Sequence, residues 1–134
     1  MTTERNVWIF IEQEGGQIAE ISLELLAKGH ELAQTLGSQV WALLCGHEIK
    51  DLAESIIQHG ADHVLVVDHP ELEIYRTLPY SRVAADLVRE RQPYIFLVGA
   101  SPVGRDLAPR VASAVKAGLT ADCTMLDIDP ATGN

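Results

Sequence analysis

Several absences narrow the range of functions before any motif is considered. In 134 residues there are only two cysteines, Cys45 and Cys123, which lie in apolar segments too far apart for a zinc cluster or a disulfide framework. Lysine and arginine number 10 against 19 aspartates and glutamates, so the formal charge is -9 and the basic surface that nucleic acid requires is lacking. No apolar run approaches the roughly 18 residues of a membrane-spanning helix. We therefore expect no nucleic acid partner, no membrane insertion and a reducing, cytoplasmic location.

What remains is the composition of one ordinary globular domain. Apolar residues make up 47% and charged residues 22%, while glycine and proline contribute only 10 and 6 residues. A chain of this length buries about 70% of the surface that its unfolded form exposes, so it can hold a core without cross-links. We expect one domain over residues 1–128. Residues 129–134 have the composition of a turn, which normally leads to another strand, so the sequence looks cut off there. We interpret these residues as a turn or as the start of a linker to a missing C-terminal domain.

Five short apolar runs predict β-strands. The first four are continuous, which is typical of strands covered on both faces in a parallel sheet. The fifth alternates with polar residues and changes parity near Met125, which predicts an edge strand with a bulge or bend. The runs are Val7–Ile11, Val40–Cys45, Val64–Val67, Tyr94–Val98 and Leu119–Ile128.

Segments with helical spacing lie between the runs. Each carries an apolar stripe about one face wide, so each helix should pack on the sheet by one side. Gly37 stands where the first helix should end, and the third follows Pro79 and ends before Pro93. The order β-α-β-α-β-α-β-α-β predicts an α/β fold with a three-layer, doubly wound, mostly parallel five-stranded sheet, for which 3-2-1-4-5 is the common strand order. The stripes are Ile18–Leu36, Ile49–Ile57, Tyr80–Val88 and Leu107–Val115.

The junction after the fourth run is the strongest candidate site. Two glycines allow a sharp turn, and a hydroxyl and a carboxylate can cap free N–H groups at the start of the next helix. In the order 3-2-1-4-5 this loop borders the crevice in which doubly wound sheets bind ligands, so its arginines predict contact with an anion, a nucleotide or a partner subunit. The structural alternative is a capped helix in which Arg105 and Asp106 pair locally. The candidate residues are Ser101, Gly104, Arg105, Asp106 and Arg110.

Other segments offer weaker candidates. The loop Glu12–Gln17 is acidic and has no Gly-x-Gly-x-x-Gly, so we interpret its glycine pair as a flexible turn. The five histidines lack the spacing of a helical metal-ligand pair, and no Gly-x-Ser-x-Gly nucleophile elbow occurs. We expect neither a metal site nor a catalytic centre.

Two longer stretches are far more specific than these motifs. Gly104–Arg110 reads Gly-Arg-Asp-Leu-Ala-Pro-Arg, and Gly118–Thr124 reads Gly-Leu-Thr-Ala-Asp-Cys-Thr. With the opening Val7–Glu12, the segment Leu25–Ala33 and Gly60–Asp62, they resemble the alpha subunit of electron transfer flavoproteins over nearly the whole chain. The resemblance implies a Rossmann-like domain, similar to adenine nucleotide alpha hydrolases, at the start of that subunit.

The resemblance also implies a function. The family forms heterodimers of an alpha and a beta subunit that carry electrons on FAD between dehydrogenases and a membrane quinone reductase or another acceptor. This chain would be the N-terminal domain that contacts the beta subunit and binds no cofactor, because a separate domain of the alpha subunit binds FAD. It would be an electron carrier component and not an enzyme. The alternative is a stand-alone nucleotide-binding protein of the universal-stress type, which has the same layout.

Overall fold

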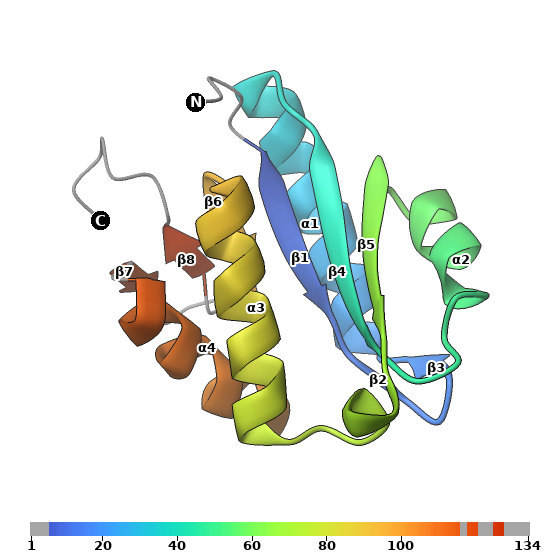
Figure 1. Cartoon of the computed structure of the whole chain (residues 1–134). Coiled ribbons are helices and arrows are strands. Elements are labelled where there is room, and N and C mark those ends of the chain that lie inside the picture. The colour runs from blue at the N-terminus through green and yellow to red at the C-terminus, as the bar shows by residue number, and fades with distance from the viewer. Residues whose placement is uncertain (1–5, 116–117, 121–124, 128–134) are drawn as a thin grey trace.

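Four parallel strands form the centre of the fold (Figure 1), which a computed structural model describes for residues 6–115, 118–120 and 125–127. The continuous apolar runs of the sequence are these strands, as predicted. Every residue is buried in the first and in the last of these strands, whereas the residues of the third, at the edge of the sheet, are only partly buried or exposed. The strands are β1 (Val7–Ile11), β4 (Val40–Gly46), β5 (His63–Asp68) and β6 (Ile95–Leu97).

The strand order β5-β4-β1-β6 confirms the order 3-2-1-4 expected for the first four runs. β1 is central, because Val7 lies opposite Val40 of β4 on one side and opposite Ile95 of β6 on the other. The direction of chain progress therefore reverses between β1 and β6. In doubly wound sheets, the crevice beyond the carboxyl ends of the strands at such a reversal is the usual ligand site.

The fifth apolar run is where the sheet differs from the five strands expected. It contains two short strands, β7 (Gly118–Thr120) and β8 (Met125–Asp127), which pair with each other in antiparallel fashion. β8 also pairs antiparallel with β6, Leu97 lying opposite Met125, so the sheet has six strands within the described residues. The change in the alternation of apolar and polar residues near Met125 coincides with the start of β8, the second of these strands. Residues 129–134 lie outside the described residues.

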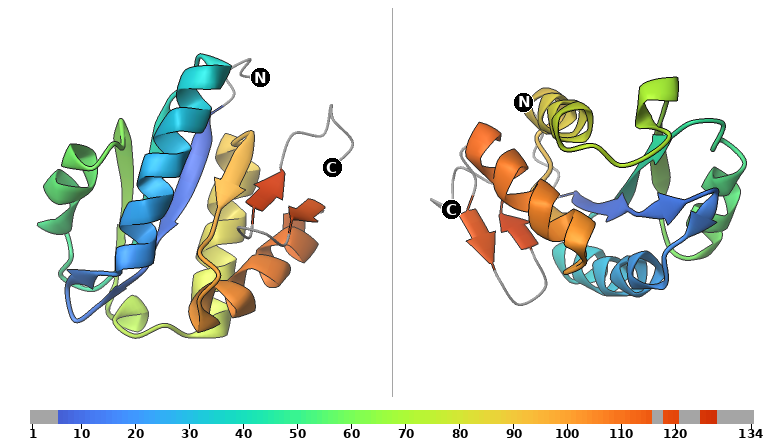
Figure 2. Two further views of the ribbon diagram at one scale, coloured as in Figure 1. Left: turned by 180° about the vertical axis from the view of Figure 1, so that it is seen from behind. Right: turned by 90° about the horizontal axis from the view of Figure 1, so that it is seen from below.

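Helices cover both faces of the sheet, which gives the three layers expected (Figures 1 and 2). α1 and α2 pack against one face, and α3 and α4 pack against the other. None of the helices within the described residues combines the length and the apolar character needed to cross a membrane. The helices are α1 (Glu20–Leu36), α2 (Leu52–Gln58), α3 (Thr77–Arg91) and α4 (Pro102–Val115), with a 3-10 turn, η1 (Pro70–Leu72), before α3.

Single residues set the ends of the long helices. α1 ends at Gly37, whose φ of 67° lies in the left-handed region that glycine adopts without strain, as predicted. α3 begins at Thr77, ahead of Pro79, which lies in the first turn, where a missing N–H breaks no helical hydrogen bond. The same helix ends at Arg91, before Pro93, as expected.

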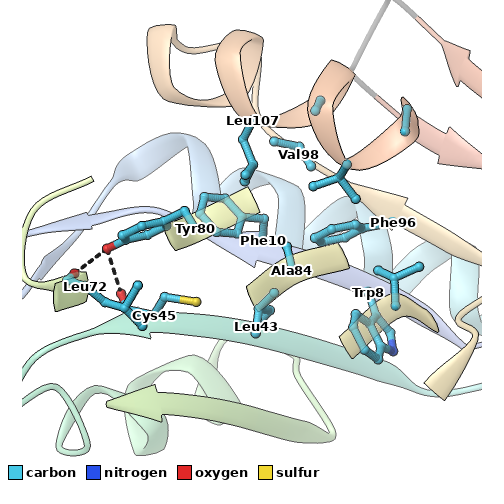
Figure 3. Close-up of a cluster of buried hydrophobic side chains, with 14 residues drawn as sticks. Trp8, Phe10, Leu43, Cys45, Leu72, Tyr80, Ala84, Phe96, Val98 and Leu107 are labelled. Carbon is cyan, nitrogen blue, oxygen red and sulfur yellow. Dashed lines mark hydrogen bonds between the residues drawn. The ribbon is translucent and has the colours of Figure 1, made fainter. Parts of the chain in front are cut away.

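Alternate residues of β1 face the two helix layers. Its odd-numbered residues belong to the cluster beneath α1 and α2, and Trp8 and Phe10 belong to the cluster beneath α3 and α4. In the second cluster, shown in Figure 3, Trp8 meets Phe96 edge to face with 6.0 Å between ring centroids. Phe10 meets Tyr80 in the same way at 6.3 Å. Helix side chains thus seal both faces of the central strand, so a ligand reaches β1 only at its ends.

The segment after β1 forms a small hairpin. β2 (Gln13–Glu14) and β3 (Gln17–Ile18) pair antiparallel around Gly15 and Gly16, whose φ angles are 58° and 84°. Two positive φ angles in a two-residue loop are typical of a type I′ turn, which requires glycine or a similar residue. The loop interpreted as a flexible turn is the tip of this hairpin, where the Gln13 side chain accepts a hydrogen bond from the Gly16 N–H at 3.1 Å.

Candidate functional site

The candidate loop lies where β6 ends and α4 begins. Ser101 precedes the helix, and its Oγ accepts a hydrogen bond from the Gly104 N–H at 3.0 Å. Ser101 is therefore the N-cap, and Pro102 takes the first helical position, where a missing N–H is tolerated. The Arg105 N–H donates to the Ser101 carbonyl at 2.8 Å. Of the two caps that the sequence allows, Ser101 is the one used.

Ser101 also donates to a carboxylate that is remote in the sequence. Its Oγ lies 2.7 Å from both carboxylate oxygens of Glu12, which directly follows β1. The Glu12 N–H in turn donates to the Oγ of Ser22, a fully buried residue of α1, at 2.8 Å. A chain of hydrogen bonds therefore runs from the Gly104 N–H through the Ser101 hydroxyl to Glu12. It places a negative charge at the positive end of the α4 dipole.

The Glu12 carboxylate thus lies at the crevice where the strand order reverses. Glu12 and Ser101 follow the neighbouring strands β1 and β6, and they meet beyond the carboxyl ends of both. An anion at the N-terminus of α4 would approach this carboxylate and be repelled. Sequence reasoning missed the role of Glu12 because the contact joins residues 89 positions apart. The available signal was an acidic residue directly after the first strand, which neighbours the fourth in the expected order.

Gly104 is required by space and not by backbone freedom. A Cβ built on it would lie 1.8 Å from the Gly99 carbonyl oxygen and 3.1 Å from Cγ1 of Val98. The sharp turn that we expected glycine to permit is not its role, because the glycines with positive φ in the described residues lie elsewhere. The first turn of α4 folds back so closely on the loop that follows β6 that no side chain fits at this position.

Asp106 binds two hydroxyl groups of the segment that leads into α3. Its Oδ2 accepts hydrogen bonds from the hydroxyls of Tyr75 and Thr77, each at 2.6 Å. These bonds, first that from Thr77, lower the pKa of Asp106, and the Arg110 guanidinium, whose Nε is 3.8 Å from Oδ1, acts in the same direction. Asp106 therefore fastens the start of α3 to α4. No sequence pattern indicated Tyr75 or Thr77, because this contact depends on how the two helices cross.

Arg105 and Arg110 lie on the solvent side of α4. Arg105 is exposed and its side chain has no partner among the described residues, so it does not form the local pair with Asp106 that the sequence allowed. Arg110 makes an i,i+4 pair with Asp106 while 55% of its side chain is exposed, and such a pair contributes little stability. Ser101, Gly104 and Asp106 are engaged within the fold, whereas both arginines are accessible.

The remaining candidate groups offer little reactivity. Burial raises the pKa of Cys45 to about 12, so its thiol stays protonated, as expected of a buried cysteine. Cys123 lies outside the described residues. Across the part of the chain that the structure describes, no three His, Cys, Asp or Glu side chains are grouped so as to hold a metal ion.

Comparison with known proteins shows what the chain is similar to. The family model of the electron transfer flavoprotein domain matches residues 7–132. The electron transfer flavoprotein subunit alpha of Clostridium acetobutylicum is 47% identical over 125 residues, which are 93% of this chain and 37% of that protein. The acryloyl-CoA reductase electron transfer subunit beta of Anaerotignum propionicum is 46% identical over 125 residues, 93% of this chain and 34% of that protein. The chain spans little more than a third of these relatives.

A solved structure shares the fold. The universal stress protein from Archaeoglobus fulgidus in complex with dAMP matches with a TM-score of 0.52, covering 79% of this chain and 90% of that one, at 12% identity. The likeness confirms the Rossmann-like α/β architecture predicted from the sequence. At this identity it concerns the fold and not the ligand.

Proposed function

Because the chain belongs to the electron transfer flavoprotein domain family, we propose that it is the N-terminal docking domain of an alpha subunit. It binds a beta subunit, and the cytoplasmic heterodimer carries electrons on FAD between dehydrogenases and a quinone reductase or another acceptor. The family match over residues 7–132 carries this proposal. The names of the two relatives, an alpha subunit and an electron transfer subunit, support it.

The outward side of α4 supports the docking role. In a chain with a formal charge of -9, Arg105 and Arg110 are exposed cations on a helix whose inward residues are fixed by the fold. Charges at the rim of an interface orient two proteins and speed their association. We therefore assign these arginines to contacts with acidic groups of the beta subunit.

We further propose that this domain binds neither flavin nor nucleotide and performs no catalysis. The residues at the α4 N-terminus do not fit the pyrophosphate of FAD, because Glu12 already supplies a carboxylate to the Ser101 hydroxyl. Helix side chains cover both faces of β1, so within the described residues a ligand could approach that strand only from its ends, and at its carboxyl end Glu12 and Glu14 would repel a phosphate. FAD would then be bound by the remainder of the alpha subunit.

Mixing the purified chain with the beta subunit of the same organism tests the docking proposal. Sedimentation velocity at micromolar concentration should show a one-to-one complex, and this chain alone should be colourless. As a control, Glu54→Gln changes an exposed position on α2, away from α4, and should assemble as the unsubstituted chain does. Two separate boundaries would contradict the docking role, and a yellow chain with stoichiometric flavin would contradict the absence of a cofactor.

The second candidate function is nucleotide binding of the universal-stress type. Only the fold likeness to the protein crystallised with dAMP favours it. Calorimetry with ATP, AMP and FAD separates the two functions, because the docking domain should give no binding heat with any of them. Tight binding of ATP would favour the second candidate over the first.

A further inference from the structure

A cleft of about 640 Å³ opens at the carboxyl ends of β1 and β4. Its walls are the β2–β3 hairpin and the segment between η1 and α3, which Figure 1 shows at the same end of the molecule. Its position is separate from the solvent side of α4, although the first turn of that helix borders it through Val103. The apolar part of its lining includes Phe10, Ile18, Cys45, Tyr75 and Tyr80.

The cleft is negatively charged. Glu12, Glu14 and Glu73 line it, and no lysine, arginine or histidine does. Glu12 is bonded to Ser101, but Glu14 and Glu73 are exposed and their carboxylates have no partner among the described residues. Charges of one sign around a concave apolar surface concentrate the local field, so the cleft attracts cations and repels phosphates.

Two tyrosine rings in the lining are held in place. The ring centroids of Tyr75 and Tyr80 are 4.9 Å apart. The Tyr75 hydroxyl donates to Asp106, and the Tyr80 hydroxyl lies within hydrogen-bonding distance of the Leu72 and Cys45 carbonyls (Figure 3). Tyr80 is buried, with 5% of its surface exposed, and it supports the ring of Tyr75, which is only partly buried. A fixed aromatic ring beside carboxylates favours a guanidinium or an ammonium group, which is attracted to the ring as well as to the acid.

The hairpin wall is preformed. The Gln13 side chain donates to the Cys45 carbonyl at 3.2 Å, which ties the hairpin to the end of β4. Gly46 leaves the room that this contact needs, because a Cβ there would lie 2.7 Å from Nε2 of Gln13. An occupant therefore meets a formed surface and does not have to order it.

Exposed apolar side chains beside the cleft indicate a protein as the occupant. Ile74 lines the cleft and is 69% exposed, and Leu78, at the start of α3, is 70% exposed. Large exposed apolar groups beside a polar rim are typical of surfaces that bind proteins. A metal ion or a free amine would leave Ile74 uncovered.

We propose that this cleft docks a basic segment of a partner protein. An arginine or lysine of that segment enters the space bordered by Glu14 and Glu73 and lies against the ring of Tyr75, and a neighbouring apolar residue covers Ile74. Charge complementarity and the exposed apolar rim together select this occupant. The inference rests on the proposed function only for the existence of a protein partner.

A peptide titration tests the cleft without using the beta subunit. Acetyl-Leu-Arg-Leu-amide, added at millimolar concentration to the isotope-labelled chain, should shift the backbone amide signals of residues 13–18 and 73–75 in a saturable way. The charge-reversed acetyl-Leu-Glu-Leu-amide should not. Salt should weaken the binding, because the carboxylates involved are exposed.

A matched pair of double variants locates the binding. Glu14→Gln with Glu73→Gln should weaken binding of the arginine peptide about tenfold, as expected when two partly exposed ion pairs are lost. Glu54→Gln with Glu90→Gln removes the same charge from exposed positions on α2 and α3 and should leave the affinity unchanged. The proposal would be overturned if the two double variants bound the arginine peptide equally or if both peptides bound the unsubstituted chain equally. It would also be overturned if the shifts were confined to other residues or if no shift saturated. Failure of the beta subunit to associate would contradict the proposed docking function. It would not affect the peptide titration, which tests the cleft alone.

Discussion

The inward and outward sides of α4 show how one short stretch of sequence divides between the fold and the surface. On the inward side, Ser101 caps the helix, Gly104 touches the end of β6 and Asp106 binds the segment before α3. On the outward side, Arg105 has no partner among the described residues and Arg110 makes only an exposed pair. A specific sequence motif can therefore consist mostly of residues that are required by contacts within the fold.

The contrast between the two sides of α4 separates residues that the fold requires from residues that are available to a partner protein. The inward residues are engaged in contacts within the fold, so the fold alone accounts for their presence. The outward arginines carry no such constraint, so a docking role is the physical reason we propose for them. Substitutions on the two sides should separate stability from assembly.

The largest effect on stability is expected from Gly104→Ala. The added Cβ would lie 1.8 Å from the Gly99 carbonyl oxygen, so the first turn of α4 must move away from the loop that precedes it. We expect a loss of about 3 kcal/mol or more in the free energy of unfolding, measured by chemical denaturation. Gly16→Ala, where only the positive φ matters, should cost about 1 kcal/mol. Equal losses in the two variants would show that close contact is not the reason for Gly104.

The next effect concerns Asp106 and its dependence on pH. Because the hydroxyls of Thr77 and Tyr75 lower the pKa of Asp106 in the folded chain, the stability it contributes is present above its unfolded pKa and is lost as the pH falls through the folded pKa. Asp106→Asn should therefore lower the melting temperature at pH 7, and the difference from the unsubstituted chain should shrink below about pH 4. Melting curves at both pH values measure this, with Asp86→Asn as the control. A difference that stays constant with pH would contradict the assigned contact.

A smaller loss is expected from Ser101→Ala. The variant leaves the Gly104 N–H without its cap and Glu12 without its donor, which should cost about 1 kcal/mol. Combining it with Glu12→Gln should cost less than the sum of the single losses, because both substitutions break the same contact. Ser113→Ala, on the exposed side of α4, is the matched control. Strict additivity in the double-mutant cycle would contradict the coupling of Ser101 and Glu12.

The smallest effect on stability is expected on the outward side. Arg105→Ala and Arg110→Ala should each change the free energy of unfolding by less than about 0.5 kcal/mol. In sedimentation experiments they should weaken association with the beta subunit by up to about tenfold. Lower stability with unchanged assembly would contradict this assignment, because it would show that the arginines serve the fold and not the interface.

The buried strands were predictable because their signal is local. The continuous apolar run Val7–Ile11 indicates a strand, and all five of its residues are buried. The run Val64–Val67 also forms a strand, but β5 lies at the edge of the sheet and is only partly buried, which the run itself does not reveal. Gly37 ends its helix through its own backbone. The fifth run was less predictable, since alternation alone does not distinguish one bent strand from two antiparallel ones. The six-stranded sheet follows from pairing with β6, which no local pattern contains.

The candidate site was only partly predictable for the same reason. The sequence located the loop at the end of β6 and offered Ser101 as a cap. It did not reveal Glu12, Tyr75 or Thr77 as partners, because those contacts depend on which strands are neighbours and on how α3 and α4 cross. It also left the reason for Gly104 open, since glycine serves close approach and positive φ equally well.

The central place of β1 has a consequence for biosynthesis. Among the strands of this sheet, β1 is synthesised first and finds β4 as its first neighbour, but its other edge stays open until Ile95–Leu97 has been made. Pairing between segments so distant in the chain is slow, and an open apolar edge invites association with other nascent chains. Moving the chain termini by circular permutation, so that β6 is translated next to β1, should shorten this exposed interval.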